Sequence, residues 1–430
     1  MSGLGREAGS AAWGIADQAL ISLANFLTML LLARSLDPSG FGSFVVVYTV
    51  LLFVTSIQMT LITRPHNVLA AGLQADDYGS YTSGALAGQA LLALLFTATA
   101  LLAAGIAFAL GAGLAPLLLA LAAVVFAWQM QEFARQLQYT RRRADQAFAY
   151  DFIRYGGAVS LIALLWHLDS LTSETALHSL ALTAGLSALY GLRRLDLRLG
   201  SWRPVFRRNW VLVRWTFADC AGQWLSVELY PFLLAALSGV SATGAAKAVQ
   251  TLVAPSHVVM NAFEAFLVPR AARAVSRGGK KAMLAFLIPI AALAALPLVA
   301  FWLLISLLGS QIIGFVYGDA YAGYAPMIWV CVAGYLALYT VQAQSLALLV
   351  LGEVKAIFAA RVVSVALTLT LGIVFVTQWG AYGAFGGVLV SLAAMSGVLA
   401  WRLSKAGEEA IWTSDETTPA GRDRAPGVAI

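Results

Sequence analysis

The sequence predicts an all-α integral membrane protein with about twelve transmembrane helices in two lobes of six. Composition, the spacing of apolar segments and a weak internal repeat lead to this fold class. Of the 430 residues, 60% are hydrophobic and 11% are charged, whereas a soluble domain carries about 25% charged residues. A globular fold of this length cannot bury so much apolar surface, so the lipid bilayer must act as its solvent.

Twelve segments are long and apolar enough to cross a bilayer, which requires about 20 mainly apolar residues. The N-terminal sequence MSGLGREAGSAAWG lacks a basic region followed by a small-residue cleavage site. We therefore expect no removable signal peptide, and the first segment should remain as a membrane helix. The predicted spans are 11–34, 42–63, 83–109, 114–137, 146–167, 174–192, 211–238, 243–268, 283–308, 323–350, 355–377 and 380–402.

A basic stretch at 193–210, RRLDLRLGSWRPVFRRNW, separates the first six spans from the last six. The predicted organisation is a first lobe (1–192), a cytoplasmic linker (193–210), a second lobe (211–404) and a disordered polar tail (405–430). Apolar and aromatic side chains alternate with the arginines of the linker. This pattern suits a segment that rests on anionic lipid headgroups, and its place between two sets of spans argues against a nucleic-acid patch.

The distribution of Lys and Arg predicts the orientation of the chain in the membrane. With the N-terminus in the cytoplasm, all 27 basic residues fall at cytoplasmic ends or loops except Arg34, Arg154 and Lys247. The external turns instead carry acidic residues, namely Asp37, Asp169, Glu174 and Asp319. This pattern predicts both termini in the cytoplasm and fits a bacterial inner membrane. The net charge of +6 then reflects orientation signals and lipid contacts rather than a nucleic-acid surface.

The two lobes repeat each other weakly. Residues 13–33 and 215–235 share the word W-x-x-A-D at an offset of 202, which places Asp17 and Asp219 at matched positions. A second echo relates 147–149 (AFA) to 357–359 (IFA) at an offset of 210. Because six spans per lobe is an even number, both lobes insert the same way up. They are expected to be related by a pseudo-two-fold axis along the membrane normal.

Charged residues inside the spans are the candidates for a substrate cavity. Such a charge costs about 2.5–3.5 kcal/mol at the bilayer centre and usually faces the interior of a bundle. Arg154 is the first choice for a diphosphate contact, because its planar fork suits phosphate oxygens. The full set of cavity candidates is Arg154, Asp151, Asp17, Asp219, Glu228 and Lys247.

Each cavity candidate also has a structural interpretation. Asp17 and Asp219 can be hydrogen-bond partners of neighbouring helices. Asp151 and Arg154, at i and i+3, can neutralise each other on one helix face. Glu228 and Lys247 lie on adjacent spans and can pair across the second lobe, whereas a lysine without a partner there would attract an anion. A further acid, Glu264, is expected to meet the basic inner surface through Arg270 or Arg273.

The sequence contains no set of residues that predicts catalysis, a cofactor or a metal site. The four histidines are scattered without ligand spacing, and His257 is the candidate for proton coupling, with simple packing as the alternative. Cys220 and Cys331 lie in apolar segments and are interpreted as buried thiols. The absence of a P-loop and of H-E-x-x-H indicates that the chain neither hydrolyses ATP nor acts as a zinc hydrolase.

Five stretches of the sequence carry a resemblance to a known family, and they cover most of the chain in order. They are LLLARSLDPSGFGSFVVVYTV, RRRADQAFAYDFIRYGGAV, GAAKAVQTLVAPSHVVMNAFEAFLVPRAARAV, FVYGDAYAGYAPMIWV and LLVLGEVKAIFAARVV. On these stretches the chain resembles the Wzx-like polysaccharide flippases, of O-antigen and capsule type, in the multidrug/oligosaccharidyl-lipid/polysaccharide (MOP) exporter superfamily. It departs from that pattern at Lys247, where relatives often have an aromatic residue, and at Glu228, where many have Asp.

The resemblance implies two six-helix lobes of MATE-like type around a central cavity. It also implies alternating access that moves an undecaprenyl-diphosphate-linked oligosaccharide across the bacterial inner membrane for surface polysaccharide biosynthesis. Implied partners are this substrate, anionic inner-leaflet lipids, and a polysaccharide polymerase with other assembly proteins. Proton movement, sodium movement or consumption of the product can each supply the energy.

Two alternative functions stay open at this point. One is a cation-coupled multidrug exporter of the same superfamily. The other is a membrane-embedded polysaccharide polymerase or ligase, a class that usually displays a long external loop with catalytic residues. The external turns are short here, which disfavours an enzyme.

Overall fold

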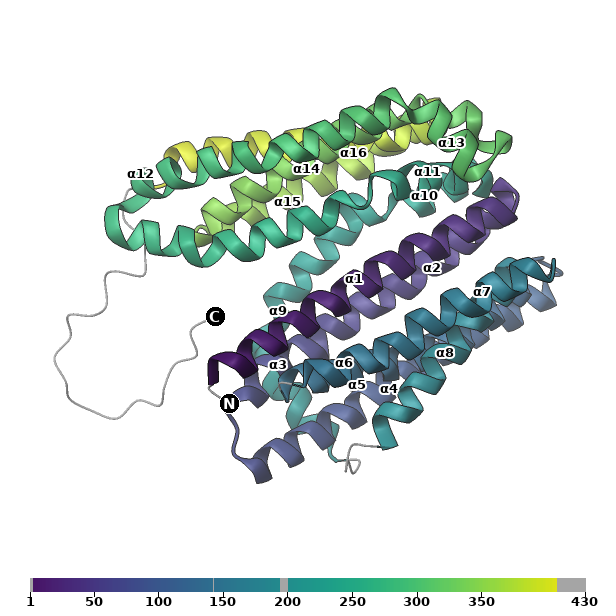
Figure 1. Ribbon diagram of the computed structural model, residues 1–430, viewed down its shortest axis with the longest axis horizontal. Helices are drawn as coiled ribbons and strands as arrows, with labels where there is room; N and C mark the ends of the chain where they lie inside the picture. Colours follow the sequence, from purple (N-terminus) through teal and green to yellow (C-terminus); the bar gives the residue numbers. More distant parts are fainter. Residues whose placement is uncertain (1–2, 142, 194–199, 408–430) are drawn as a thin grey trace.

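The computed structural model describes residues 3–141, 143–193 and 200–407, and within these ranges it contains helices and turns without β-strands. Most of the predicted tail and residues 194–199 of the predicted linker lie outside the described residues. Figure 1 shows the helices in two groups, purple to blue and green to yellow, with α9 running between them. The predicted all-α membrane fold is confirmed.

The elements of the first group are α1 (Gly3–Ser35), α2 (Pro38–Gln58), the π-helical turn η1 (Met59–Thr63), α3 (Arg64–Leu69), η2 (Ala70–Gly72), α4 (Ala75–Ala109), α5 (Ala115–Thr140), α6 (Ala144–Asp151), the π-helical turn η3 (Phe152–Gly156), α7 (Gly157–His167) and α8 (Ser173–Arg193). The elements that follow are α9 (Trp202–Gln223), the π-helical turn η4 (Trp224–Glu228), α10 (Tyr230–Leu237), α11 (Val240–Val253), α12 (Ser256–Leu307), α13 (Gly309–Tyr317), η5 (Asp319–Tyr324), α14 (Met327–Val350), α15 (Val354–Leu367), the π-helical turn η6 (Thr368–Gly372) and α16 (Ile373–Lys405).

In the described part of the chain, nine helical stretches are long and apolar enough to cross a membrane, or ten when the bent pair formed by 216–228 and α10 counts as one span. Two of the nine, Ser256–Leu307 and Val354–Lys405, are 52 residues long. A straight helix of that length would extend about 78 Å, more than twice the roughly 30 Å hydrocarbon core. Each is therefore long enough for two membrane passes. Seven single spans, the bent pair and these four passes make the twelve that the sequence predicts.

Glycines mark the points where the two long stretches break. Gly279 has a φ of 63° and Gly380 has a φ of 54°, a region that residues with a Cβ atom adopt rarely. Figure 1 shows α12 reversing its direction near its middle. At the other break, a Cβ atom on Gly383 would collide with the carbonyl oxygen of Phe375, so the two passes approach closely there. The sequence predicts that one span ends at 268 and the next begins at 283, and Gly279 lies between these limits. It also predicts a span that begins at 380, the position of the second break.

The two ends of the bundle differ in charge. The end that carries the α5–α6 turn, the end of α8 and the break in α12 is called the basic end, and it contains Arg141, Arg143 and Arg193. Lys280 Nζ lies 2.9 Å from the carbonyl oxygen of Ala406, which places the break in α12 beside the end of α16. The end that carries the α1–α2 turn is called the opposite end. The cytoplasmic location of the basic end stays a prediction.

The two lobes meet at the opposite end, where α2 crosses α11. Neither Gly42 nor Gly244 has room for a side chain, because an added Cβ atom would collide with the carbonyl oxygen of Val240 in the first case and of Pro38 in the second. Close by, Arg34 Nη1 of α1 donates a hydrogen bond to the carbonyl oxygen of Phe315, at 3.0 Å. These close contacts hold the lobes together at that end.

Residues 202–210 of the predicted linker form the first part of α9, which continues as the first helix of the second lobe. This part packs on the first lobe. Gly200 N donates to the carbonyl oxygen of Ser83 at 3.2 Å, and Tyr81 Oη donates to Asn209 Oδ1 at 2.7 Å. The domain limits stay a prediction, but the connection between the lobes is helical from Trp202 onward.

Candidate substrate cavity and buried charge cluster

A cavity of about 500 Å³ lies between α2 of the first lobe and the helices of the second lobe. Val45, Tyr48 and Thr49 line it from α2, while most of its wall comes from α11, α12, α14 and α16. The acidic, basic and histidine side chains on this wall are Glu228, Lys247, His257, Glu264 and Arg361. The cavity therefore combines a polar interior with apolar walls, as ligand sites usually do.

Lys247 on α11 presents a cation to this cavity. Its Nζ atom hydrogen-bonds to Gln250 Oε1 at 3.0 Å, one turn along the same helix. Glu228 lines the same cavity from η4, but among the described residues no ion pair within 4.0 Å involves Lys247. Lys247 and Glu228 therefore face the same cavity as opposite charges that interact electrostatically without forming an ion pair within 4.0 Å. His257 lies on α12, with its ring 5.1 Å from the ring of Tyr335.

Arg361 on α15 brings the second cation to the cavity wall. Its Nε atom lies 3.4 Å from Asp219 Oδ1 of α9. Gly222, one turn after Asp219, leaves space for this side chain, because a Cβ atom there would lie 3.0 Å from Arg361 Cγ. The Asp219 side chain is 45% exposed, so this ion pair is open to solvent or to a substrate. Asp219 is not among the residues that line the cavity, but it pairs with Arg361, which does line it.

The remaining candidates from the first lobe meet in a buried charge cluster. Its centre is Arg135 of α5, whose guanidinium contacts three carboxylates from three elements. Nη2 lies 2.9 Å from Asp17 Oδ2 of α1, Nη1 lies 3.0 Å from Glu132 Oε1 of α5, and Nε pairs with Asp151 of α6. Tyr139 adds a hydroxyl donor to Asp17. Arg135 therefore ties α1, α5 and α6 together inside the lobe.

Arg154 forms the second cation of this cluster and is buried, with 2% of its side chain exposed. Its Nη1 atom lies 3.1 Å from Glu132 Oε2 and also donates to Gln131. The guanidinium stacks on Trp128, with Cζ 3.5 Å from the ring centroid, and such cation–π contacts add to the binding of Arg. Arg154 does not belong to the residues that line the cavity. The expected local ion pair of Asp151 with Arg154 is wrong. Asp151 pairs with Arg135 instead, and Arg154 pairs with Glu132.

The cluster contains one more carboxylate than guanidinium. Asp17, Glu132 and Asp151 face Arg135 and Arg154. One oxygen, Asp17 Oδ1, is buried and has no hydrogen-bond partner in the structure. One proton or one monovalent cation would balance the formal charge. Within the described ranges, no group of three His, Cys, Asp or Glu residues is arranged to hold a metal ion.

Three charged residues that were not among the predicted site residues are central in the structure. Glu132, Arg135 and Arg361 have charge partners from distant parts of the chain. The hydropathy pattern places them near the predicted cytoplasmic ends of spans. Charged residues are usual at such ends, so their presence there does not indicate a site. The i, i+3 spacing of Glu132 and Arg135 was the available signal for them. Glu264, which the sequence assigned to the basic surface, also lines the cavity.

No protein-family model matches the sequence, and no curated protein matches it. Solved structures match over most of the chain. An inward-facing multidrug resistance MATE family transporter of the MOP superfamily has a TM-score of 0.71 at 14% identity, over 90% of this chain and 95% of that chain. The lipid II flippase MurJ, in an inward closed conformation, has a TM-score of 0.68 at 12% identity, over 92% of this chain and 87% of that chain.

This chain has the fold of the MOP superfamily transporters. An outward-facing MATE family transporter has a lower TM-score of 0.60, at 15% identity, over 91% of this chain and 93% of that chain. The chain is thus a multi-pass membrane protein, and its own side chains form the cavity between α2 and the second lobe.

Proposed function

We propose that this MOP-fold chain is a flippase that translocates an undecaprenyl-diphosphate-linked oligosaccharide across the bacterial inner membrane for surface polysaccharide biosynthesis. The observation that carries the proposal is Lys247, a cation on the cavity wall. Its ammonium group hydrogen-bonds to the side-chain oxygen of Gln250 and has no ion-pair partner within 4.0 Å among the described residues. A diphosphate is the anion that such a site suits, because phosphate oxygens accept hydrogen bonds from ammonium groups. The resemblance of the sequence to polysaccharide flippases and the fold shared with a lipid II flippase support this substrate class.

In the proposed mechanism the two lobes rock about the cavity and expose it to one side of the membrane at a time. The diphosphate lies near Lys247 and Arg361, the sugars occupy the polar part of the cavity, and the lipid tail stays in the bilayer between the lobes. Since the chain binds and moves its substrate without changing covalent bonds, it is not an enzyme in this proposal. Its partners are the lipid-linked oligosaccharide, anionic lipids of the inner leaflet and the polymerase that consumes the product.

A second candidate function is a cation-coupled multidrug exporter of the same superfamily. The observation that favours it is the excess carboxylate of the buried charge cluster, because a site that lacks one positive charge can take up a proton or a sodium ion. His257 is a further candidate for proton coupling on the cavity wall. A polysaccharide polymerase or ligase is a third candidate, and the short connections at the opposite end do not favour it.

The test is deletion of the gene in its native bacterium, complemented with the wild type, with Lys247→Gln or with Lys405→Gln. Lys405 lies at the end of α16 and is not part of the cavity wall, so it is a matched control for loss of one lysine. We expect the deletion strain to accumulate lipid-linked oligosaccharide on the cytoplasmic leaflet. The wild type and Lys405→Gln should restore surface polysaccharide fully, and Lys247→Gln should restore only a small part of it.

Two outcomes would contradict the proposed flippase function. Normal surface polysaccharide in the deletion strain, together with increased drug sensitivity, would favour the multidrug exporter. Accumulation of single repeat units on the outer leaflet would instead indicate a block after translocation and favour a polymerase or ligase.

A further inference from the structure

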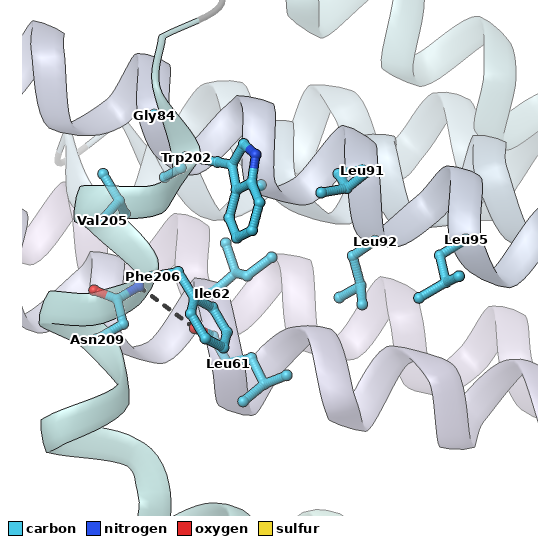
Figure 2. Close-up of a pocket in the computed structure, with 12 residues that line it drawn as sticks. Leu61, Ile62, Gly84, Leu91, Leu92, Leu95, Trp202, Val205, Phe206 and Asn209 are labelled. Atoms are coloured by element: carbon cyan, nitrogen blue, oxygen red, sulfur yellow. Dashed lines mark hydrogen bonds between the residues drawn. The ribbon is translucent and has the colours of Figure 1, made fainter.

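An apolar groove of about 140 Å³ lies where the first turns of α9 cross α4 and η1. Leu61 and Ile62 of η1 form one part of it, and Trp202 and Phe206 of α9 form another. Figure 2 shows both aromatic rings pointing toward the space beside α4, along which Leu91, Leu92 and Leu95 follow one another. This groove is distinct from the central cavity, with which it shares no lining residue.

Two glycines of α4 set the shape of the groove. A Cβ atom on Gly84 would lie 2.6 Å from Val205 Cγ2 and 2.7 Å from the Ser201 carbonyl oxygen, so Gly84 allows α9 to sit directly on α4. Gly88, one turn further along, is different. A Cβ atom there would make only an ordinary contact, 3.7 Å from Trp202 Cβ. Gly88 therefore has room for a methyl group and lines the groove without close contact to the backbone of α9.

The groove runs from the basic end toward the middle of the membrane. From Gly84 to Leu95, α4 rises about 16 Å, roughly half of a hydrocarbon core about 30 Å thick. Its lining remains exposed in the structure, by 59% for Leu95, 37% for Trp202 and 42% for Phe206. In a membrane protein such a surface is covered by hydrocarbon, because water is excluded at this depth.

Three arginines lie beside the aromatic residues of α9 that line the groove. Arg203, Arg207 and Arg208 lie on the same turns of α9 as Trp202 and Phe206, and all three are exposed. Arg203 Cζ lies 5.8 Å from the Trp202 ring centroid. Among the described residues, none of the three arginines forms an ion pair. Exposed cationic side chains on the helix that lines an apolar groove are complementary to a lipid that has a negative headgroup.

We propose that this groove binds one acyl chain of an anionic phospholipid, with the lipid phosphate at the arginines that begin α9. The chain lies beside Gly88 and extends along α4 to Leu95. Because the first part of α9 is also the connection between the lobes, the bound lipid joins that connection to the first lobe. Such a site depends on the leaflet lipid and not on the transported substrate.

The test uses the full-length protein reconstituted in bilayers that contain trace phosphatidylglycerol or phosphatidylcholine with a photoreactive group on the acyl chain. Labelled peptides are identified by mass spectrometry. We expect the phosphatidylglycerol probe to label the peptides around 88–95 and 202–206 several-fold more than the phosphatidylcholine probe does. The double variant Arg203→Gln and Arg207→Gln should abolish this preference, and Gly88→Phe should reduce labelling by both probes.

A matched control is the double variant Arg402→Gln and Lys405→Gln, which removes two charges from the end of α16 and should leave the preference unchanged. The arginine variants alter exposed side chains, so they test the proposal even if Gly88→Phe does not fold. Equal labelling by the two probes in the wild type would show ordinary contact with bulk lipid and overturn the proposal. Displacement of the phosphatidylglycerol probe by a trace of undecaprenyl phosphate, but not by unlabelled phosphatidylglycerol, would overturn it in favour of a site for the substrate tail.

Discussion

Arg361 Nε lies 3.4 Å from Asp219 Oδ1 and joins α15 to α9 beside the central cavity. Asp219 corresponds to Asp17 of the first lobe at the repeat offset of 202, and Arg361 corresponds to Asp151 at the offset of 210. The second lobe thus pairs an acid with a base where the first lobe has two acids. The first lobe supplies the missing cation from a third helix, through Arg135 of α5. Two related positions are neutralised in two different ways.

The first prediction concerns the stability of these two arrangements. Replacing Arg135 with Met leaves three carboxylates without their shared cation in a buried site, which should cost about 3–5 kcal/mol. Replacing Arg361 with Met breaks a single pair whose acid is half-exposed, and this should cost less than about 1 kcal/mol. The measurement is denaturant or thermal unfolding of the purified proteins. Equal stability of the two variants would contradict the central role of Arg135.

The second prediction concerns compensation inside the buried charge cluster. Adding Asp151→Asn to Arg135→Met removes one of the uncompensated carboxylates, so the double variant should be more stable than Arg135→Met alone. The expected coupling is about 0.5–3 kcal/mol, the range for residues in direct contact. A double-mutant cycle of unfolding free energies measures it. Strictly additive effects would mean that the two side chains do not interact in solution.

The third prediction separates the cavity from the cluster. Lys247→Gln should lower transport about tenfold, which corresponds to about 1.4 kcal/mol, with a normal amount of protein in the membrane. Arg154→Ala should lower transport as well, but through loss of folded protein, because its removal leaves Glu132 in a buried site without one of its partners. Transport and membrane abundance should be measured on the same samples. Normal abundance of Arg154→Ala with lost transport would return Arg154 to its predicted role as a substrate contact.

The fourth prediction concerns the contact between the lobes. Gly42→Ala places a methyl group against the Val240 carbonyl oxygen, where there is no space, so the lobes should separate more often at the opposite end. Spin labels at Thr172 and Gln311, one in each lobe, should then report a larger population at long distance. Gly105→Ala on α4 is the control, because nothing lies within 4 Å of its added Cβ atom. An unchanged distance distribution in Gly42→Ala would show that α2 and α11 do not meet closely in the membrane.

The sequence by itself determined the membrane class and the approximate limits of the spans. The physical reason is that a helix in lipid must satisfy its own backbone and present apolar side chains, so hydropathy along the chain records each pass. The breaks at Gly279 and Gly380 fall near the predicted limits for the same reason. The matched positions of Asp17 and Asp219 were also visible in the repeat.

Only the tertiary structure decided which charges meet. Arg154 was predicted to face the cavity, and instead it stacks on Trp128 and pairs with Glu132. Lys247 and Glu228, predicted on equal grounds, do line the cavity. The partner of a buried charge depends on how helices distant in sequence pack side by side, and hydropathy carries no information about that packing. A charge near the end of a span, such as Arg135, looks like an orientation signal until the structure places three carboxylates around it.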